Sequence, residues 1–226
     1  WYGGLEANTA KGRKRIKEEL AFLAARGVNN VRVLAGAEGA GPINGVPRVE
    51  PALQTTPGIF NTALLEGLDF LLAELGKRNM KAIIYFSNNW EWSGGFLQYL
   101  NWNGKIADSV LRRKLGWDEM RDLVSGFYQC SPCISQYEAQ LKLLVNRTNS
   151  ITKKKYRDDP AIMAWEIANE PRPMRPAMID AYKKFIHQTA TLIRTLDPNH
   201  LVTTGAEGDM GTENMEVFRS IHEDKA

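Results

Sequence analysis

The 226-residue sequence has few cysteines, few histidines and no long apolar run, and each shortage excludes a class of protein. No apolar stretch approaches the roughly 18 residues that a membrane-spanning helix needs, and no basic start leads into the apolar segment of a signal peptide. We therefore expect no membrane partner and no signal peptide in this chain. The formal net charge is +3, and the basic residues are scattered apart from Lys153 to Lys155. This distribution disfavours a nucleic-acid partner.

The two cysteines, Cys130 and Cys133, form a lone C-x-x-C motif. A zinc site needs two further ligands, and the three histidines show no spacing that completes one, so we expect no metal. The motif lies between two helical patterns rather than after a strand, so a local disulfide or two free thiols is favoured over redox chemistry. The glycine-rich residues 36–41 have the wrong spacing for a dinucleotide-binding loop, and we expect no cofactor.

Four β-rich runs alternate with helical patterns along the chain. We predict strands at residues 28–35, 81–86, 161–169 and 200–205, and helices at residues 11–26, 64–75, 134–145 and 179–196. Strands separated by helices pair in parallel, because antiparallel neighbours need no helix between them. The sequence therefore predicts an α/β fold.

The connections between these elements are unequal in length. Helix-to-strand links are short, whereas the strand-to-helix links at residues 36–59 and 87–116 are long. In a (β/α)₈ TIM barrel, functional sites lie on the face that the strand-to-helix loops form. A whole barrel needs about 250 residues and eight strands, and this chain offers four strands and a stub at residues 1–4. We predict one catalytic barrel domain, residues 1–226, incomplete at both ends and supplying roughly strands 2 to 5; an open doubly wound sheet is the alternative.

The segment from Trp165 to Arg172 carries the strongest chemical signal. Its strand is predicted to end at Pro171, which leaves Glu170 at the strand end where barrel enzymes place catalytic groups. Apolar surroundings favour the protonated form of a carboxyl group, which suits a general acid. Asn169 supplies a donor and an acceptor for a sugar hydroxyl. An ion pair with a nearby arginine is the structural alternative for Glu170.

Arg32 is a charged residue within an apolar strand. A buried guanidinium needs a carboxylate partner, and Glu166 is the candidate, which makes a structural role the favoured interpretation of Glu166. Glu166 also has the same side-chain parity as Glu170, so we expect both to point into the barrel. The functional alternative for Arg32 is a fixed positive charge beside a carboxylate nucleophile.

Aromatic and amide side chains crowd residues 87–95, directly after the second predicted strand. Trp90 and Trp92 can stack on the apolar faces of sugar rings, and Asn88 and Asn89 can reach sugar hydroxyls. Packing beneath a long loop is the alternative for the two tryptophans. Glu207 follows the last predicted strand and is either a second site carboxylate or a solvated loop residue.

These motifs together resemble clan A glycoside hydrolases, in particular the family 5 endo-β-1,4-mannanases. They occur in that family's order along nearly the whole chain: Val31-Arg-Val-Leu, Asn88-Asn-Trp, Gly94-Gly, Asn146-Arg-Thr-Asn, Tyr156-Arg-Asp-Asp-Pro, Trp165 to Arg172 and Thr203-Thr-Gly-Ala-Glu-Gly. The resemblance implies retaining endo-hydrolysis of mannan, galactomannan or glucomannan by a secreted or periplasmic enzyme. A β-1,4-glucanase of the same family and a non-catalytic sugar-binding barrel fragment are the alternatives.

The resemblance also implies roles for individual residues. Glu170 corresponds to the acid/base, Asn169 to a partner of the 2-hydroxyl of the reacting sugar, and Arg32 to a residue that orients the nucleophile. The other substrate-binding residues that it implies are Trp90, Asn88 and Asn89 on the glycone side, Arg172 and Glu207 on the leaving-group side, and Tyr2 lining the cleft; Trp92 remains a substrate-binding candidate through its ring.

The family's nucleophile is a second glutamate on a later strand, and we expect it beyond residue 226. A retaining mechanism needs two carboxyl groups about 5–5.5 Å apart, so one carboxyl group is not enough. We therefore expect residues 1–226 alone to be inactive, with the remaining strands supplied by the same parent polypeptide or by a companion chain.

Overall fold

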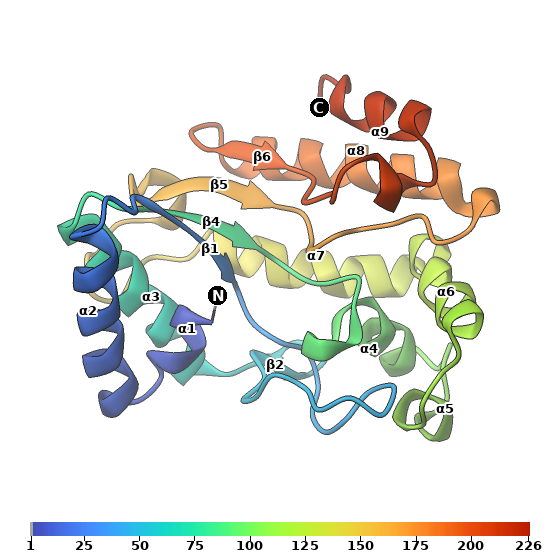
Figure 1. Cartoon of the computed structure of the whole chain (residues 1–226), viewed down its shortest axis with the longest axis horizontal. Helices are drawn as coiled ribbons and strands as arrows, with labels where there is room; N and C mark the ends of the chain where they lie inside the picture. Colours follow the sequence, from blue (N-terminus) through green and yellow to red (C-terminus); the bar gives the residue numbers. More distant parts are fainter. Residues whose placement is uncertain (1) are drawn as a thin grey trace.

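The computed structural model describes residues 2–226 and confirms the predicted alternation of strands and helices (Figure 1). One sheet contains parallel strands in the order β1–β4–β5–β6: β1 (Asn30–Leu34), β4 (Lys81–Tyr85), β5 (Ile162–Glu166) and β6 (Leu201–Thr203). Each strand lies within a run that the sequence predicts. A separate antiparallel hairpin of β2 (Gln54–Thr56) and β3 (Ile59–Phe60) interrupts the loop after β1.

Helices connect and cover the strands. They are α1 (Gly3–Glu6), α2 (Ala10–Ala24), α3 (Thr62–Lys77), α4 (Gly95–Trp102), α5 (Asp108–Arg112), α6 (Trp117–Ser125), α7 (Ser131–Val145), α8 (Ile179–Leu196) and α9 (Met215–His222), with short 3₁₀ turns η1 (Glu91–Ser93), η2 (Gly126–Gln129), η3 (Tyr156–Asp158), η4 (Pro176–Met178) and η5 (Asp209–Thr212). Asn61 caps α3 by accepting a hydrogen bond from the backbone N–H of Ala63 at 3.0 Å. Of the described helices, none has both the length and the apolar character required to cross a bilayer.

The start of the chain differs from the prediction. Gly3–Glu6 form the short helix α1 instead of a strand stub, and Trp1 lies outside the described residues. Local hydrogen bonds account for the helix, because Glu6 donates its N–H to the carbonyl of Tyr2 at 3.0 Å. The helix then leads closely into α2, where a Cβ atom at Gly12 would lie 1.6 Å from the carbonyl oxygen of Glu6. Only glycine fits this contact.

The end of β5 and the loop after β4 also differ from the prediction. β5 ends at Glu166, and the chain turns at Glu170, which has a positive φ of 52°, before it reaches Pro171. Alternation along a strand therefore does not determine where Glu170 points. Residues 87–116 are not an open loop, because they contain η1, α4 and α5.

A core of aromatic side chains supports the carboxyl ends of the strands. The ring of Trp165 in β5 stacks on Phe86 with 5.2 Å between ring centroids, and its indole N–H donates to Asp197 at 2.6 Å. Rings from α4, η2, α7 and α8 pack together nearby: Phe96, Tyr99, Phe127, Tyr137 and Phe185. The loops that follow the strands therefore rest on a densely packed base.

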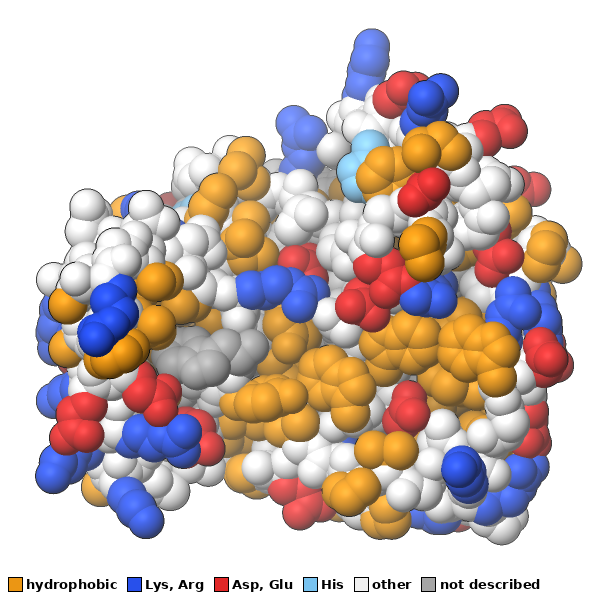
Figure 2. All heavy atoms as spheres, in the orientation of Figure 1, with side chains coloured by type: hydrophobic (Ala, Val, Ile, Leu, Met, Phe, Trp, Pro, Cys, Tyr) orange, Lys and Arg blue, Asp and Glu red, His pale blue; other side chains and the backbone are white. Residues whose placement is uncertain are grey.

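The two edge strands of the sheet are β1 and β6. Each pairs with a single neighbour within residues 2–226. Phe22, Leu23 and Val28 line a surface hollow beside β1, and Leu201 on β6 is exposed. Figure 2 shows hydrophobic side chains in a band across the middle of the visible face. Unpaired strand edges and exposed apolar side chains are features that a closed barrel covers.

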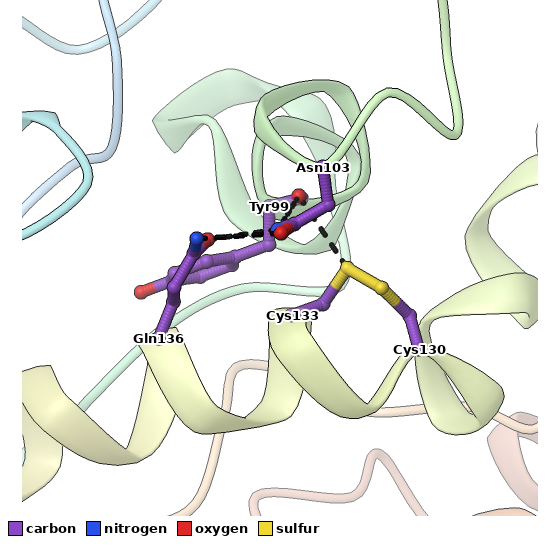
Figure 3. The surroundings of a disulfide bond; sticks show 5 residues. All are labelled: Tyr99, Asn103, Cys130, Cys133 and Gln136. Carbon is purple, nitrogen blue, oxygen red and sulfur yellow. Dashed lines mark hydrogen bonds between the residues drawn. A yellow bond between two sulfur atoms is a disulfide. The ribbon is translucent and has the colours of Figure 1, made fainter.

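Cys130 and Cys133 form a disulfide at the start of α7, which decides between the two favoured interpretations of this motif (Figure 3). Both cysteines are buried, whereas redox motifs expose their reactive thiol. The sulfur of Cys133 lies 3.4 Å from the carbonyl oxygen of Tyr99 in α4. Beside it, the amide of Asn103 donates to Gln136 at 2.9 Å. The disulfide thus belongs to the contact between α4 and α7.

Candidate active site

The strand-to-helix loops gather at one side of the sheet. The register places Leu34, Tyr85, Glu166 and Thr203 in one row across the four strands. The chain segments that leave this row lead toward the side of the molecule that carries α4, α5 and α6 (Figure 1). The motifs that the sequence singled out therefore follow neighbouring strand ends in space.

Glu170 is held at this side by backbone and side-chain contacts. Its backbone N–H donates to the carbonyl of Gly205 at 3.0 Å, and the indole N–H of Trp90 donates to its Oε2 at 2.5 Å. A left-handed conformation is uncommon for a residue with a Cβ atom and persists where surrounding contacts impose it, often at active sites. The side chain is partly exposed. Glu170 is thus an oriented carboxyl group that remains accessible.

Arg32 joins Glu166 and Asn169 beneath Glu170. Its Nε lies 3.0 Å from Oε2 of Glu166, its Nη2 contacts the other oxygen, and the same Nη2 donates to Oδ1 of Asn169 at 2.8 Å. Burial acts to lower the pKa of Arg32, but the hydrogen bond and the charge of the buried Glu166 act to raise it. The net result is a pKa above the usual value of arginine. The expected ion pair between Glu166 and Arg32 is present. Arg32 therefore binds one carboxylate and orients the side chain of Asn169.

Asn88 connects Asn169 to the loop after β4. Its Oδ1 accepts from Nδ2 of Asn169 at 3.0 Å and from the backbone N–H of Trp90 at 3.1 Å. Asn88 and Asn89 are fully buried, so they support the cleft rather than line its open surface. Asn89 accepts from the backbone N–H of Arg172 at 3.3 Å. The two asparagines thereby link the segments that carry Trp90 and Glu170.

Arg172, in the loop after β5, and Glu207, in the loop after β6, form an ion pair. The guanidinium carbon of Arg172 lies 4.9 Å from the ring centre of Trp90, within the range of a cation–π contact. Burial lowers the pKa of Arg172, while the charge of Glu170 acts to raise it. The Nε of Arg172 and the Nδ2 of Asn89 are buried donors without a partner within residues 2–226. Buried donors are normally paired, so these two are expected to meet a ligand or a covering segment.

Trp92 and Tyr2 form a separate aromatic pair. Their rings meet edge to face, with centroids 6.3 Å apart. Among residues 2–226, no described hydrogen bond or ring contact joins either of them to Glu170. The structure thus brings together Glu170, Asn169, Arg32, Asn88, Asn89, Trp90, Arg172 and Glu207, and places Trp92 and Tyr2 in a second group.

Trp117 was not identified from the sequence. It is the first residue of α6, and its ring stacks on that of Trp90 with centroids 6.1 Å apart and planes 21° apart. The sequence shows an aromatic residue at the end of a long loop, but no spacing that ties Trp117 to Trp90. Figure 2 shows hydrophobic side chains directly below adjacent acidic and basic ones on the visible face.

Glu38 is a second residue that the sequence did not reveal. It follows β1, is fully buried, and its carboxyl oxygens accept from Ser87 Oγ at 2.9 Å, Gly95 N–H at 3.0 Å and Gln140 Nε2 at 3.2 Å. Burial raises its pKa to about 7, although these hydrogen bonds and Arg48 act to lower it. Glu38 therefore joins the loops after β1 and β4 to α7.

Glu38 is expected to make folding stability depend on pH. The folded protein keeps this group protonated up to about pH 7, whereas in the unfolded chain it ionises near its ordinary value of 4.5. Unfolding then releases a proton between these values, so the free energy of unfolding falls as the pH rises, by up to about 3 kcal/mol. Urea unfolding across this pH range should show the fall in the free energy of unfolding in wild type but not in Glu38→Gln. Glu216→Gln, at an exposed position of α9, is the control, and an equal slope in Glu38→Gln would contradict the assignment.

Comparison with known proteins places this chain in a family. Residues 1–226 match the protein-family model described as GH family 5 beta-mannosidase-like. The chain belongs to glycoside hydrolase family 5. A family 5 mannosidase from Rhizomucor miehei, solved in complex with mannosyl-fructose, matches with a TM-score of 0.85 and 29% identity, over 100% of this chain and 53% of that one. The predicted (β/α)₈ barrel class is thereby confirmed, and the described sheet is part of such a barrel.

The curated relatives of the chain include plant proteins. Mannan endo-1,4-beta-mannosidase 8 of Oryza sativa subsp. japonica is 32% identical over 218 residues, which cover 96% of this chain and 53% of the relative. Putative mannan endo-1,4-beta-mannosidase 4 of Arabidopsis thaliana is 37% identical over 172 residues, covering 76% of this chain and 39% of the relative. The chain thus spans about half the length, or less, of these curated relatives.

Proposed function

We propose that this chain is part of a family 5 (β/α)₈ barrel that hydrolyses β-1,4-mannosidic bonds within mannans, with Glu170 as the acid/base. The observation that carries the proposal is the position of Glu170 beyond the end of β5, where Trp90 orients its carboxyl group. The names of the curated relatives support mannan as the substrate. In the proposed reaction, Glu170 protonates the leaving glycosidic oxygen and then removes a proton from the attacking water.

The nucleophile is proposed to come from the rest of the barrel. Glu166 is buried in the ion pair with Arg32 that the sequence predicts, and Glu207 is paired with Arg172, so we assign a structural role to the first and a substrate-binding role to the second. The unpaired edges of β1 and β6 support additional strands that close the single domain. Residues 1–226 alone are then expected to show no turnover of mannan in a reducing-sugar assay. Appreciable turnover would place the nucleophile within this chain.

Asn169 is proposed to hydrogen-bond the 2-hydroxyl of the reacting sugar. Arg32 and Asn88 already bind its Oδ1 and Nδ2, yet an amide has a second N–H and a second lone pair. The unpartnered Nε of Arg172, whose side chain is partly exposed, supports a further contact with a sugar oxygen next to Trp90. The disulfide supports a secreted or periplasmic location, because such bonds persist in oxidising compartments, and so does a polymeric substrate.

The substrate assignment is tested by assaying the protein in which this chain is joined to the rest of the barrel. It should release a mixture of manno-oligosaccharides from mannan, with little action on carboxymethyl cellulose, and NMR should show the β-anomer as the first product. Action on cellulose alone would favour the β-1,4-glucanase alternative, and release of mannose alone would contradict endo-hydrolysis. Mannan binding without hydrolysis would favour the sugar-binding alternative.

A further inference from the structure

Trp117 is the exposed tryptophan of the described chain, with 54% of its surface accessible. Trp90, which the sequence analysis expected to face sugar, is only partly exposed, because Arg172 lies over its ring and Trp117 stacks on it. Trp90 also uses its indole N–H to hold Glu170. The larger free aromatic surface next to the candidate active site thus belongs to Trp117.

The helix that carries Trp117 is fixed to the segment that follows Glu170. Nε of Arg175 donates to Asp122 of α6 at 2.6 Å, and Nη2 of Arg175 donates to the carbonyl of Asp118 at 2.9 Å. Nη2 of Arg121 in α6 also lies 3.4 Å from Oε1 of Glu213, which precedes α9. These contacts keep Trp117 in place relative to Glu170, and a pre-ordered ring loses little entropy when it binds a ligand.

We propose that Trp117 forms an additional sugar-binding subsite that stacks on a unit of the mannan chain away from the bond that is cleaved. The inference rests on the proposed function. An exposed aromatic ring offers a flat apolar surface to the C–H face of a pyranose, and the direct stack on Trp90 makes this surface continuous with the active site. The stack also separates two roles: Trp90 positions Glu170, and Trp117 binds substrate.

The test is the dependence of kcat/KM on substrate length in the protein with the complete barrel. In wild type, kcat/KM should rise from mannotriose to mannohexaose as the longer chain reaches Trp117. In Trp117→Ala this rise in kcat/KM should shrink roughly 10-fold, mainly because KM for the long substrates increases. Trp117→Phe keeps a flat ring and should recover much of the rise. Ile59→Ala, at a 62% exposed position of β3, is the control and should retain the wild-type rise.

A uniform loss at every substrate length would overturn the proposal, because it would show that Trp117 acts only by supporting Trp90. An unchanged rise in Trp117→Ala would overturn it as well. If Trp117→Ala fails to fold, Trp117→Leu keeps apolar bulk against Trp90 without a flat ring and should show the same reduced rise. If wild type does not hydrolyse manno-oligosaccharides at all, the proposed function itself has failed, which is a different result from any of these.

Discussion

Glu170→Gln is expected to lower kcat on mannan by about 10²- to 10⁴-fold while leaving mannan binding nearly unchanged. Glutamine has the size of glutamate and still accepts the hydrogen bond from the indole N–H of Trp90, so the cleft keeps its shape. It cannot protonate the leaving oxygen or take a proton from water. Steady-state kinetics gives kcat, and calorimetric titration with mannohexaose gives the affinity, both in the protein with the complete barrel.

Glu66→Gln provides the control for this substitution, because Glu66 lies at an exposed position of α3 and undergoes the same chemical change. It should keep both turnover and affinity. Unchanged turnover in Glu170→Gln would remove the acid/base assignment. Loss of both turnover and binding would instead make Glu170 a substrate-holding residue.

Arg32→Met is expected to lower the free energy of unfolding by about 2–4 kcal/mol, the largest loss of stability among the substitutions considered. Removing the guanidinium leaves the buried carboxylate of Glu166 without its partner, and an unpaired buried charge is costly. The value lies below the upper range for buried pairs because 42% of the Arg32 side chain is exposed, so water offsets part of the cost. Urea unfolding followed by circular dichroism measures the loss.

The double variant Arg32→Met with Glu166→Gln separates this cause from lost packing. Without the uncompensated carboxylate, the double variant should be more stable than Arg32→Met alone, so the two substitutions should not add. Equal or greater destabilisation in the double variant would show that the packing of Arg32, including its position 4.4 Å from the ring centre of Tyr85, accounts for the effect.

Much of the fold was predictable because its signals are local. β-rich runs and helical patterns placed β1, β4, β5, β6 and the long helices, and the helix predicted to end before Gly27 ends at Ala24, three residues before this glycine, which has a φ of 80°. The prediction was wrong at residues 3–4 because a four-residue helix lacks room for a periodic pattern. The C-x-x-C motif left a disulfide and free thiols open, because their distinction depends on how the chain brings the two sulfur atoms together.

The candidate site was predictable where it lies at strand ends. Asn88, Glu170 and Glu207 each follow a parallel strand, so the topology alone placed them at one side of the sheet. Glu38 accepts from Ser87, which lies 49 positions away in the sequence, and Trp117 stacks on Trp90, which lies 27 positions away. No local sequence pattern shows such contacts. The positive φ of Glu170 likewise depends on neighbouring segments, including the close approach of Gly205, whose added Cβ would lie 1.9 Å from the carbonyl oxygen of Ala168.

The most direct test of the central claim is the activity of Glu170→Ala on dinitrophenyl β-mannoside with and without azide, in the protein with the complete barrel. This leaving group departs without a proton, so sugar transfer to the enzyme should proceed, and only the step that needs a base should be slow. We predict that azide accelerates turnover and yields β-mannosyl azide, while mannan remains uncleaved. A rate that does not respond to azide, together with normal cleavage of mannan, would contradict the claim that Glu170 is the acid/base.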